Sequence, residues 1–281
     1  MMRWTLLAIL AALGSASAQE PLPELGLRDM EHARAYAMGG AFRALGQDAE
    51  SIDGNPASMS LRKQMVTEIS GAWDVATKYA FATVSMMDST TEPLGGGVSY
   101  HLVSIGRGAN RTVANVSALA LSYALSDSWF LGASTKYVQM SGAISGNAIT
   151  ADAGLTLHIF GGLVGSFSGH NLIDIRNPLM TRYYAASLGY LGGPLTLAAD
   201  VKGDFGIAPT PQFAYSFGGE YVFGPVPLRG GYAYDSISHS HFISGGLGFA
   251  TQGNGFDLAY RHEVGGAQGR LLVLTFNIKI S

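Results

Sequence analysis

Residues 212–223 have the sequence QFAYSFGGEYVF, in which bulky side chains alternate with small or polar ones. The odd positions are Phe213, Tyr215, Phe217, Tyr221 and Phe223. The even positions include Gln212, Ala214, Ser216, Gly218 and Glu220. A period of two is typical of a β-strand whose two faces meet different surroundings, so this stretch predicts a strand.

The same alternation recurs along the chain from residue 63 onward. Residues 149–159 and 195–202 show it, and the last segment sets Leu274, Phe276 and Ile278 against Thr275 and Asn277. We count about fourteen such segments, which begin near positions 63, 76, 95, 112, 128, 148, 162, 183, 194, 212, 225, 241, 255 and 270. The protein is therefore predicted to be all-β.

The composition decides where the apolar face of these strands points. Only 13% of the 281 residues are charged and 47% are hydrophobic, with a mean hydropathy of +0.20. A soluble domain carries roughly 25% charged residues, so too few are present to coat a soluble sandwich. Beyond the N-terminus no apolar run is long enough for a membrane helix. A transmembrane antiparallel β-barrel, apolar outside and small or polar inside, resolves the conflict.

Connection lengths support the barrel. The even-numbered predicted strands end in tight turns, such as those at 126–127, 161–162, 224–225 and 253–254. The odd-numbered strands mostly end in longer stretches, at 104–111, 171–181, 203–211 and 263–269. Short periplasmic turns that alternate with longer outer loops are typical of outer-membrane barrels.

The N-terminus predicts two further segments. Arg3, the apolar residues 4–13 and the small residues Ala16-Ser17-Ala18 indicate a signal peptide over 1–18. Residues 19–62 lack the alternation and are too few to bury a core of their own. We expect them to form a plug inside the lumen of a barrel over 63–281.

Several functions are excluded or lack support. A net charge of −3 gives no case for nucleic acid, and the absence of Cys removes thiolate chemistry. His239-Ser240-His241 is the nearest approach to a metal motif, and no nucleophile elbow accompanies the Ser, His and Asp residues. We expect no enzyme, no catalytic residue, no cofactor and no metal.

Charged and polar side chains fall on the predicted lumen face. They either pair across neighbouring strands, or hold the plug and line a water path. These residues are Asp152, His158, Asp200, Lys202, Glu220, Arg229, Asp235, Asp257 and Arg261.

One stretch has a family resemblance. Residues 33–42 read ARAYAMGGAF and are followed by Asp48-Ala49 and by Asn55-Pro56-Ala57-Ser58. This resembles the N-terminal signature of the FadL-like outer-membrane transporters and of the related PorV/PorQ family. Later turn-and-strand phrases at 125–132, 169–172 and 227–232 fit the same pattern. The resemblance implies fourteen strands and a plug in the lumen.

The resemblance marks Gly39, Gly40, Asn55, Pro56 and Ala57 as the plug motif. Paired glycines permit positive φ or a close approach to the wall, and Asn before Pro favours an extended or turn conformation. These residues either serve only to fold the plug or also contact a ligand. The chain departs from the family pattern with Gln at position 47, Gly at position 54 and no terminal aromatic residue, and its outer loops are shorter.

The sequence thus predicts an outer-membrane barrel that passively transports small hydrophobic molecules. Ligand would enter at the outer loops, and rearrangement of residues 19–62 would open a path. The alternatives are a PorV-like scaffold or shuttle for secreted proteins, and a barrel whose plug never moves. The expected partners are membrane lipid and either hydrophobic small molecules or secreted proteins, without nucleic acid.

Overall fold

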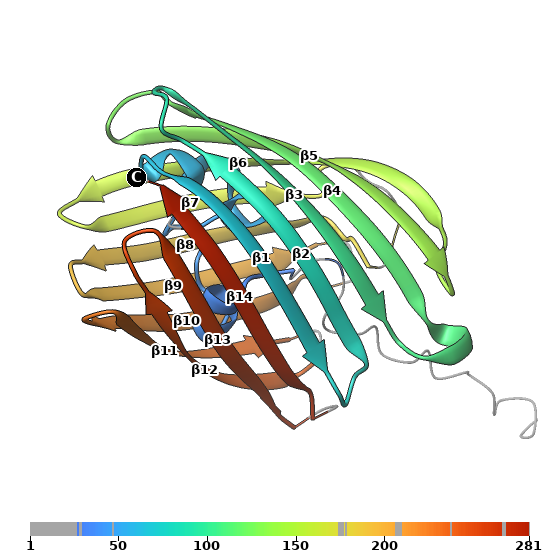
Figure 1. Ribbon diagram of the computed structural model, residues 1–281. Helices are drawn as coiled ribbons and strands as arrows, with labels where there is room; N and C mark the ends of the chain where they lie inside the picture. The colour runs from blue at the N-terminus through green and yellow to red at the C-terminus, as the bar shows by residue number, and fades with distance from the viewer. Residues whose placement is uncertain are drawn as a thin grey trace, which may run out of the picture.

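The computed structural model describes residues 27, 30–46, 48–173, 177, 179–205, 210–236, 238–265 and 268–280. The predicted signal peptide lies outside the described residues. The described chain forms a closed β-barrel, with short helices of the N-terminal region inside the ring of strands (Figure 1).

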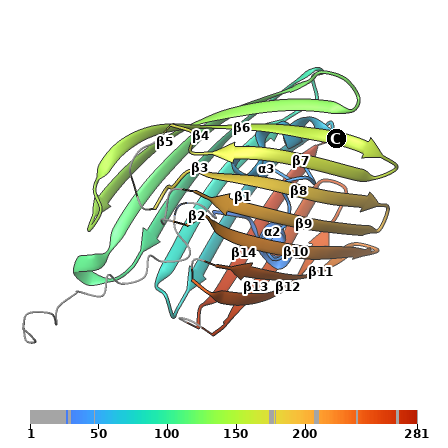
Figure 2. The same ribbon diagram turned by 180° about the vertical axis from the view of Figure 1, so that it is seen from behind.

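Every strand pairs antiparallel with its neighbours in sequence, and β14 pairs with β1 to close the ring, for example Met65 with Ile280. Figure 2 shows β7–β10 from the opposite side, with α2 and α3 visible behind them. The strands are β1 (Met65–Asp74), β2 (Tyr79–Asp88), β3 (Leu94–Ile105), β4 (Thr112–Ala124), β5 (Trp129–Gly142), β6 (Gly146–Phe160), β7 (Leu163–His170), β8 (Tyr183–Gly192), β9 (Leu195–Asp204), β10 (Gln212–Phe223), β11 (Val226–Asp235), β12 (Ser240–Ala250), β13 (Asn254–Val264) and β14 (Arg270–Ile280).

The predicted fold class is confirmed, and each strand begins within three residues of its predicted start. The barrel spans an outer membrane, and an even number of strands lets the whole ring be antiparallel. We call the end with connections 125–128, 161–162, 193–194, 224–225 and 251–253 the turn end, and the opposite end the loop end. Turns of this kind face the periplasm in outer-membrane barrels.

The alternation of connection lengths is less regular than the sequence predicts. At the loop end the connections 75–78, 143–145 and 236–239 are also short, and the turn end has a longer one at 89–93. The β5–β6 connection is short because β5 extends as far as Gly142 and β6 already begins at Gly146.

The two faces of the wall have the predicted chemistry. Phe213, Tyr215 and Phe217 of β10 are exposed on the outside, whereas Ser216 and Glu220 are buried inside. Trp129 and Tyr137 are both exposed on the outer face of β5. Because hydrocarbon solvates apolar side chains, the exposed aliphatic and aromatic residues form the lipid-facing surface.

Strand β2 departs from this rule near the loop end. Tyr79 and Phe81 point inward and are buried, while Ala82 on the outside is exposed. Further along the same strand Val84 and Met86 point outward as expected. The inward aromatic rings pack into an apolar cluster inside the lumen, described below.

The helices are short. They comprise α2 (Ala33–Ala37), α3 (Ser51–Gly54) and the 3₁₀ turns η1 (Pro56–Leu61) and η2 (Gly108–Asn110). In the described part of the chain, no helix is long and apolar enough to cross a membrane.

A charge placed on the lipid face tests this assignment. Leu119 lies mid-strand on the outer face of β4, and Leu125 is equally exposed at the turn end. We expect Leu119→Lys to lower the free energy of unfolding by about 2–4 kcal/mol, because lysine is most costly at the bilayer midplane, and Leu125→Lys by about 0–1 kcal/mol. Denaturant unfolding in phospholipid vesicles measures both, and equal losses would contradict the assignment.

Candidate functional site in the barrel lumen

The N-terminal segment, meaning the described residues from 27 to 62, packs against the inner face of the wall. Helix α2 lies against β11–β14, α3 against β3 and β4, and η1 against β3–β6. Almost every described residue from 30 to 59 is buried. These contacts place the segment in the lumen, while its boundaries at 19 and 62 stay a prediction.

Gly39 and Gly40 follow α2 where the chain touches the wall. Both have positive φ, +70° and +83°, which glycine adopts without steric cost. A Cβ on Gly39 would lie 2.8 Å from the backbone nitrogen and oxygen of Tyr232 on β11. The glycine pair therefore provides both a left-handed backbone and a close approach to the wall.

Asn55, Pro56 and Ala57 make a second contact with the wall. The Asn55 side chain accepts a hydrogen bond from Ala57 N (3.1 Å) and donates one to Thr156 Oγ1 (3.0 Å) on β6. Asn55 has an extended backbone, with φ −160° and ψ 102°, as expected before proline. Pro56 begins η1, where a missing N–H costs nothing.

At both contacts, glycines of the wall lie directly against the N-terminal segment. A Cβ on Gly154 would lie 1.9 Å from Asn55 Oδ1, and one on Gly132 would lie 2.2 Å from Ala57 N. Gly218 and Gly231 have the same role at the other contact. A Cβ on Gly218 would lie 2.2 Å from Met38 O, and one on Gly231 would lie 2.2 Å from Gly39 N. These wall positions cannot be recognised from the sequence, because inward glycines look like any other small lumen residue.

Three predicted lumen charges are brought together near the turn end. Arg229 Nε lies 2.6 Å from Glu220 Oε2, and Arg229 Nη1 lies 2.5 Å from Asp257 Oδ1. Arg34 of α2 joins them, with Nε at 3.1 Å and Nη2 at 3.0 Å from the two Glu220 oxygens. The network therefore joins three wall strands to the N-terminal segment.

Asp48 extends this network to the last strand. Its carboxylate lies 3.4 Å from Arg34 Nη1 and pairs with Lys279 of β14. A cavity of about 150 Å³ adjoins both residues at the turn end. The sequence analysis named neither Arg34 nor Lys279 as a site residue.

Asp200 and Glu68 bind other parts of the segment. Asp200 Oδ2 lies 3.1 Å from Arg43 Nη1 and accepts hydrogen bonds from the backbone N–H groups of Phe42 and Arg43. His32 Nδ1 lies 2.6 Å from Glu68 Oε2 on β1. Burial lowers the pKa of His32, but the nearby carboxylates, Glu68 first and then Glu50 and Asp48, together outweigh burial and raise that pKa to about 9, so His32 is protonated at neutral pH.

Asp152 lies in a separate cluster. Its carboxylate is 2.5 Å from Lys136 Nζ and 3.2 Å from His170 Nδ1, and Ser168 Oγ lies 2.8 Å from His170 Nε2. The order of atoms is that of a serine hydrolase triad. However, Ser168, His170 and Asp152 are at most 1% exposed, so an ester could not reach the hydroxyl in this conformation. Asp152 also accepts a hydrogen bond from the backbone N–H of Asn171, and this bond anchors the start of the β7–β8 connection.

The remaining predicted residues lie elsewhere. Arg261 of β13 stacks over the rings of Tyr36 and Phe242, with its Cζ at 5.4 and 4.3 Å from the ring centroids. Lys202 and Asp235 are half-buried on β9 and β11. His158 is exposed at the turn end of β6.

Of the two histidines in the His239-Ser240-His241 motif, His241 packs beside Tyr234 (4.8 Å between ring centroids), and its Nδ1 lies 2.7 Å from Tyr232 OH.

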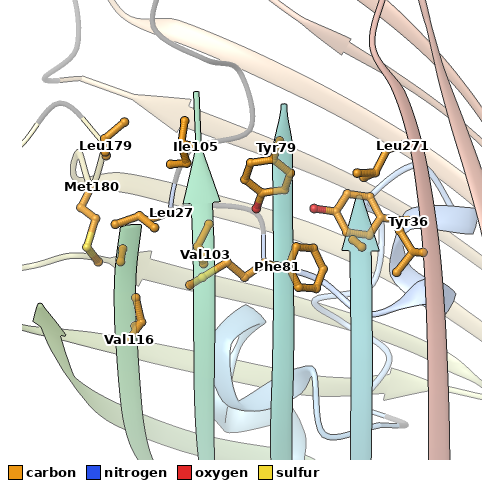
Figure 3. Packing of buried hydrophobic residues seen from close by; sticks show 14 of the residues in the cluster. Leu27, Tyr36, Tyr79, Phe81, Val103, Ile105, Val116, Leu179, Met180 and Leu271 are labelled. Atoms are coloured by element: carbon orange, nitrogen blue, oxygen red, sulfur yellow. The ribbon is translucent and has the colours of Figure 1, made fainter. Parts of the chain in front are cut away.

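Near the loop end, the lumen contains a cluster of apolar side chains, which we call the apolar cluster. Figure 3 shows its members pointing toward one another from the N-terminal segment, the wall and the β7–β8 connection. Tyr36 stacks on Phe81 at 6.3 Å between ring centroids, and Tyr79 meets Phe81 edge to face at 6.0 Å. The other principal members are Leu27, Met30, Val103, Ile105, Val116, Val138, Met140, Leu179, Met180, Leu271 and Val273.

The apolar cluster was not predicted from the sequence. The sequence feature that indicates this cluster is a strand, β2, with apolar residues on both faces: Tyr79 and Phe81 on one face, and Val84 and Met86 on the other. A purely polar lumen would not require this.

The fold defines the class of protein as a fourteen-stranded outer-membrane β-barrel. No protein-family model and no curated protein sequence matches the chain. Many solved structures are similar in fold, including the following three. The CymD monoaromatic hydrocarbon channel is 13% identical, with a TM-score of 0.63 over 89% of this chain and 96% of that chain. A Pseudomonas aeruginosa FadL homologue is 12% identical, with a TM-score of 0.61 over 89% and 97%. The Ralstonia pickettii toluene transporter TbuX is 13% identical, with a TM-score of 0.64 over 88% and 97%.

At these identities the likeness shows the fold alone. It confirms the FadL-like resemblance at the level of the barrel. The resemblance to the PorV/PorQ family stays a prediction.

The glycine contacts give a matched pair of substitutions. Gly231 faces Gly39, whereas a Cβ on the neighbouring Gly230 would meet no atom within 4 Å. We expect Gly231→Ala to lower the free energy of unfolding by about 1–3 kcal/mol through overpacking, and Gly230→Ala to leave it unchanged. Urea titration in vesicles measures both. A Gly231→Ala protein as stable as the wild type would show that the segment does not rest on this wall position.

Proposed function

We propose that the barrel lets small hydrophobic molecules cross the outer membrane passively, and that they enter through the apolar cluster. The cluster is the observation that carries the proposal, because aromatic and large aliphatic side chains gather at the loop end of a lumen, which outer-membrane barrels fill with small or polar groups. A hydrophobic solute partitions into such surroundings from water.

The composition of the cluster suits transient occupation. Leu179 and Met180 come from the β7–β8 connection, and Met140 comes from β5. Methionine side chains are flexible and adapt to irregular shapes, so they can make room for a ligand. The names of the three similar barrels add support, since one is called a monoaromatic hydrocarbon channel and another a toluene transporter.

The predicted site residues then have a supporting role. Gly39, Gly40, Asn55, Pro56 and Ala57 fix the N-terminal segment to the wall at two points. The lumen charges hold it between these points, through Arg34 with Glu220 and Arg43 with Asp200. Opening therefore requires displacement of side chains or of the stretch between the two contacts, and not departure of the whole segment.

Isosteric polar substitutions test the entry site. Val103 and Val138 are fully buried in the apolar cluster, and Val84 and Val98 face outward from β2 and β3. We expect Val103→Thr with Val138→Thr to slow uptake roughly tenfold, because two hydroxyls replace methyl groups along the hydrophobic path. Uptake of radiolabelled toluene into proteoliposomes measures the rate.

The pair Val84→Thr with Val98→Thr is the control and should take up toluene at the wild-type rate. Uptake that is unchanged by the inner pair would contradict entry through the cluster. Wild-type uptake no faster than in protein-free vesicles would contradict transport of this solute altogether. That last result would favour the scaffold or shuttle for secreted proteins, which fits the short connections at 75–78, 143–145 and 236–239.

A further inference from the structure

The inner face of β4 consists of small and apolar side chains along its whole length. From the loop end to the turn end, its inward residues are Thr112, Ala114, Val116, Ala118, Ala120, Ser122 and Ala124. None of them is charged, and five are apolar. On the opposite side of the barrel the inward residues include Asp200, Ser216 and Glu220. Strand β4 is thus an uncharged strip that runs the full height of the barrel.

This strip connects two apolar regions. Ala114 and Val116 belong to the apolar cluster at the loop end. Ala118 and Ala120 belong to a second cluster, in which the N-terminal segment contributes Ala49, Ile52 and Met59 and the wall contributes Val66 and Met87. The two clusters meet on β4 between Val116 and Ala118. Their neighbours in the wall are His101 of β3 and Lys136 of β5, which pair with Asp53 and Asp152, so a hydrophobic molecule that follows the uncharged strip passes between these two buried pairs.

At the turn end the strip opens into a cavity of about 400 Å³. Pockets for small molecules start at about 300 Å³. Its apolar lining consists of Leu61, Pro93, Leu94, Ala124 and Phe130. Its polar lining includes Lys63 and Glu92, which form an exposed ion pair of 2.8 Å. The cavity therefore combines an apolar lining with polar and charged side chains.

We propose that small hydrophobic molecules follow the inner face of β4 from the apolar cluster to this cavity, which is their last binding site before release at the turn end. The inference rests on the proposed transport function and adds its route. Between the clusters the route is closed in this conformation by Ile52 and Met59, whose side chains are buried against the strip. Rotation of the flexible Met59 side chain is the smallest movement that opens it.

Chemical filling of the cavity tests the route. The chain has no Cys, so a single Ala124→Cys substitution gives one reactive thiol in the cavity lining. Modification with a bulky maleimide should reduce toluene uptake into proteoliposomes to the rate of protein-free vesicles. Uptake by the unmodified Ala124→Cys protein is the reference against which this loss is measured.

Ser128→Cys is the matched control, because Ser128 lies in the β4–β5 connection that follows Ala124, is exposed, and does not line the cavity. Its modification should leave uptake unchanged. Full uptake by the modified Ala124→Cys protein would overturn the route, as would an equal loss in both variants. Since wild-type uptake is measured in the same experiment, failure of the route is distinguished from failure of transport.

A gain of function gives a second test. Met59→Ala shortens the side chain that closes the strip and should raise uptake severalfold, whereas Ala120→Leu lengthens an inward side chain and should lower it. Ala133→Leu on the outer face of β5 is the control for Ala120→Leu. Opposite effects of the two inner substitutions support the route, because damage to the barrel would not raise uptake. Equal uptake by both inner variants would overturn it.

Discussion

Hydrocarbon offers no hydrogen-bond partner, and the rest of this structure follows from that constraint. The strands must close into a ring, so that each backbone N–H and C=O pairs with a neighbour, and the bulky apolar side chains must face outward. Polar and charged side chains are then confined to the lumen, where each needs a partner. Much of the pairing comes from the N-terminal segment, through Arg34 with Glu220 and Arg43 with Asp200.

The lumen is divided by chemistry. Ion pairs join the N-terminal segment mainly to β1, β9, β10 and β14, with one more from Asp53 to His101 of β3, and glycines of the wall let its backbone approach closely. The side lined by β2–β5 is apolar at the loop end and continues as alanines along β4. The proposed path for hydrophobic molecules depends on this uneven distribution of charge.

The sequence predicts the barrel well because a period of two and a low charge content are properties of each strand on its own. The interior is harder to predict, because partners depend on how the segment lies in the ring. Glu220 and Asp200 could be placed on the lumen face by parity, but their partners Arg34 and Arg43 are 186 and 157 residues away. Tyr79 and Phe81 contradicted the expectation of a small or polar lumen, since they serve a cluster built from separate parts of the chain.

Spin labels at two adjacent positions of β14 test the central claim most directly. Leu274 is 43% exposed on the outer face, whereas Thr275 is 2% exposed and its Oγ1 accepts the Ala33 N–H at 2.9 Å. A label on Leu274→Cys should be relaxed by oxygen dissolved in lipid and not by a water-soluble nickel chelate, and a label on Thr275→Cys should be shielded from both. If the chelate reaches position 274 while oxygen relaxes position 275, the two faces are reversed and the account is wrong.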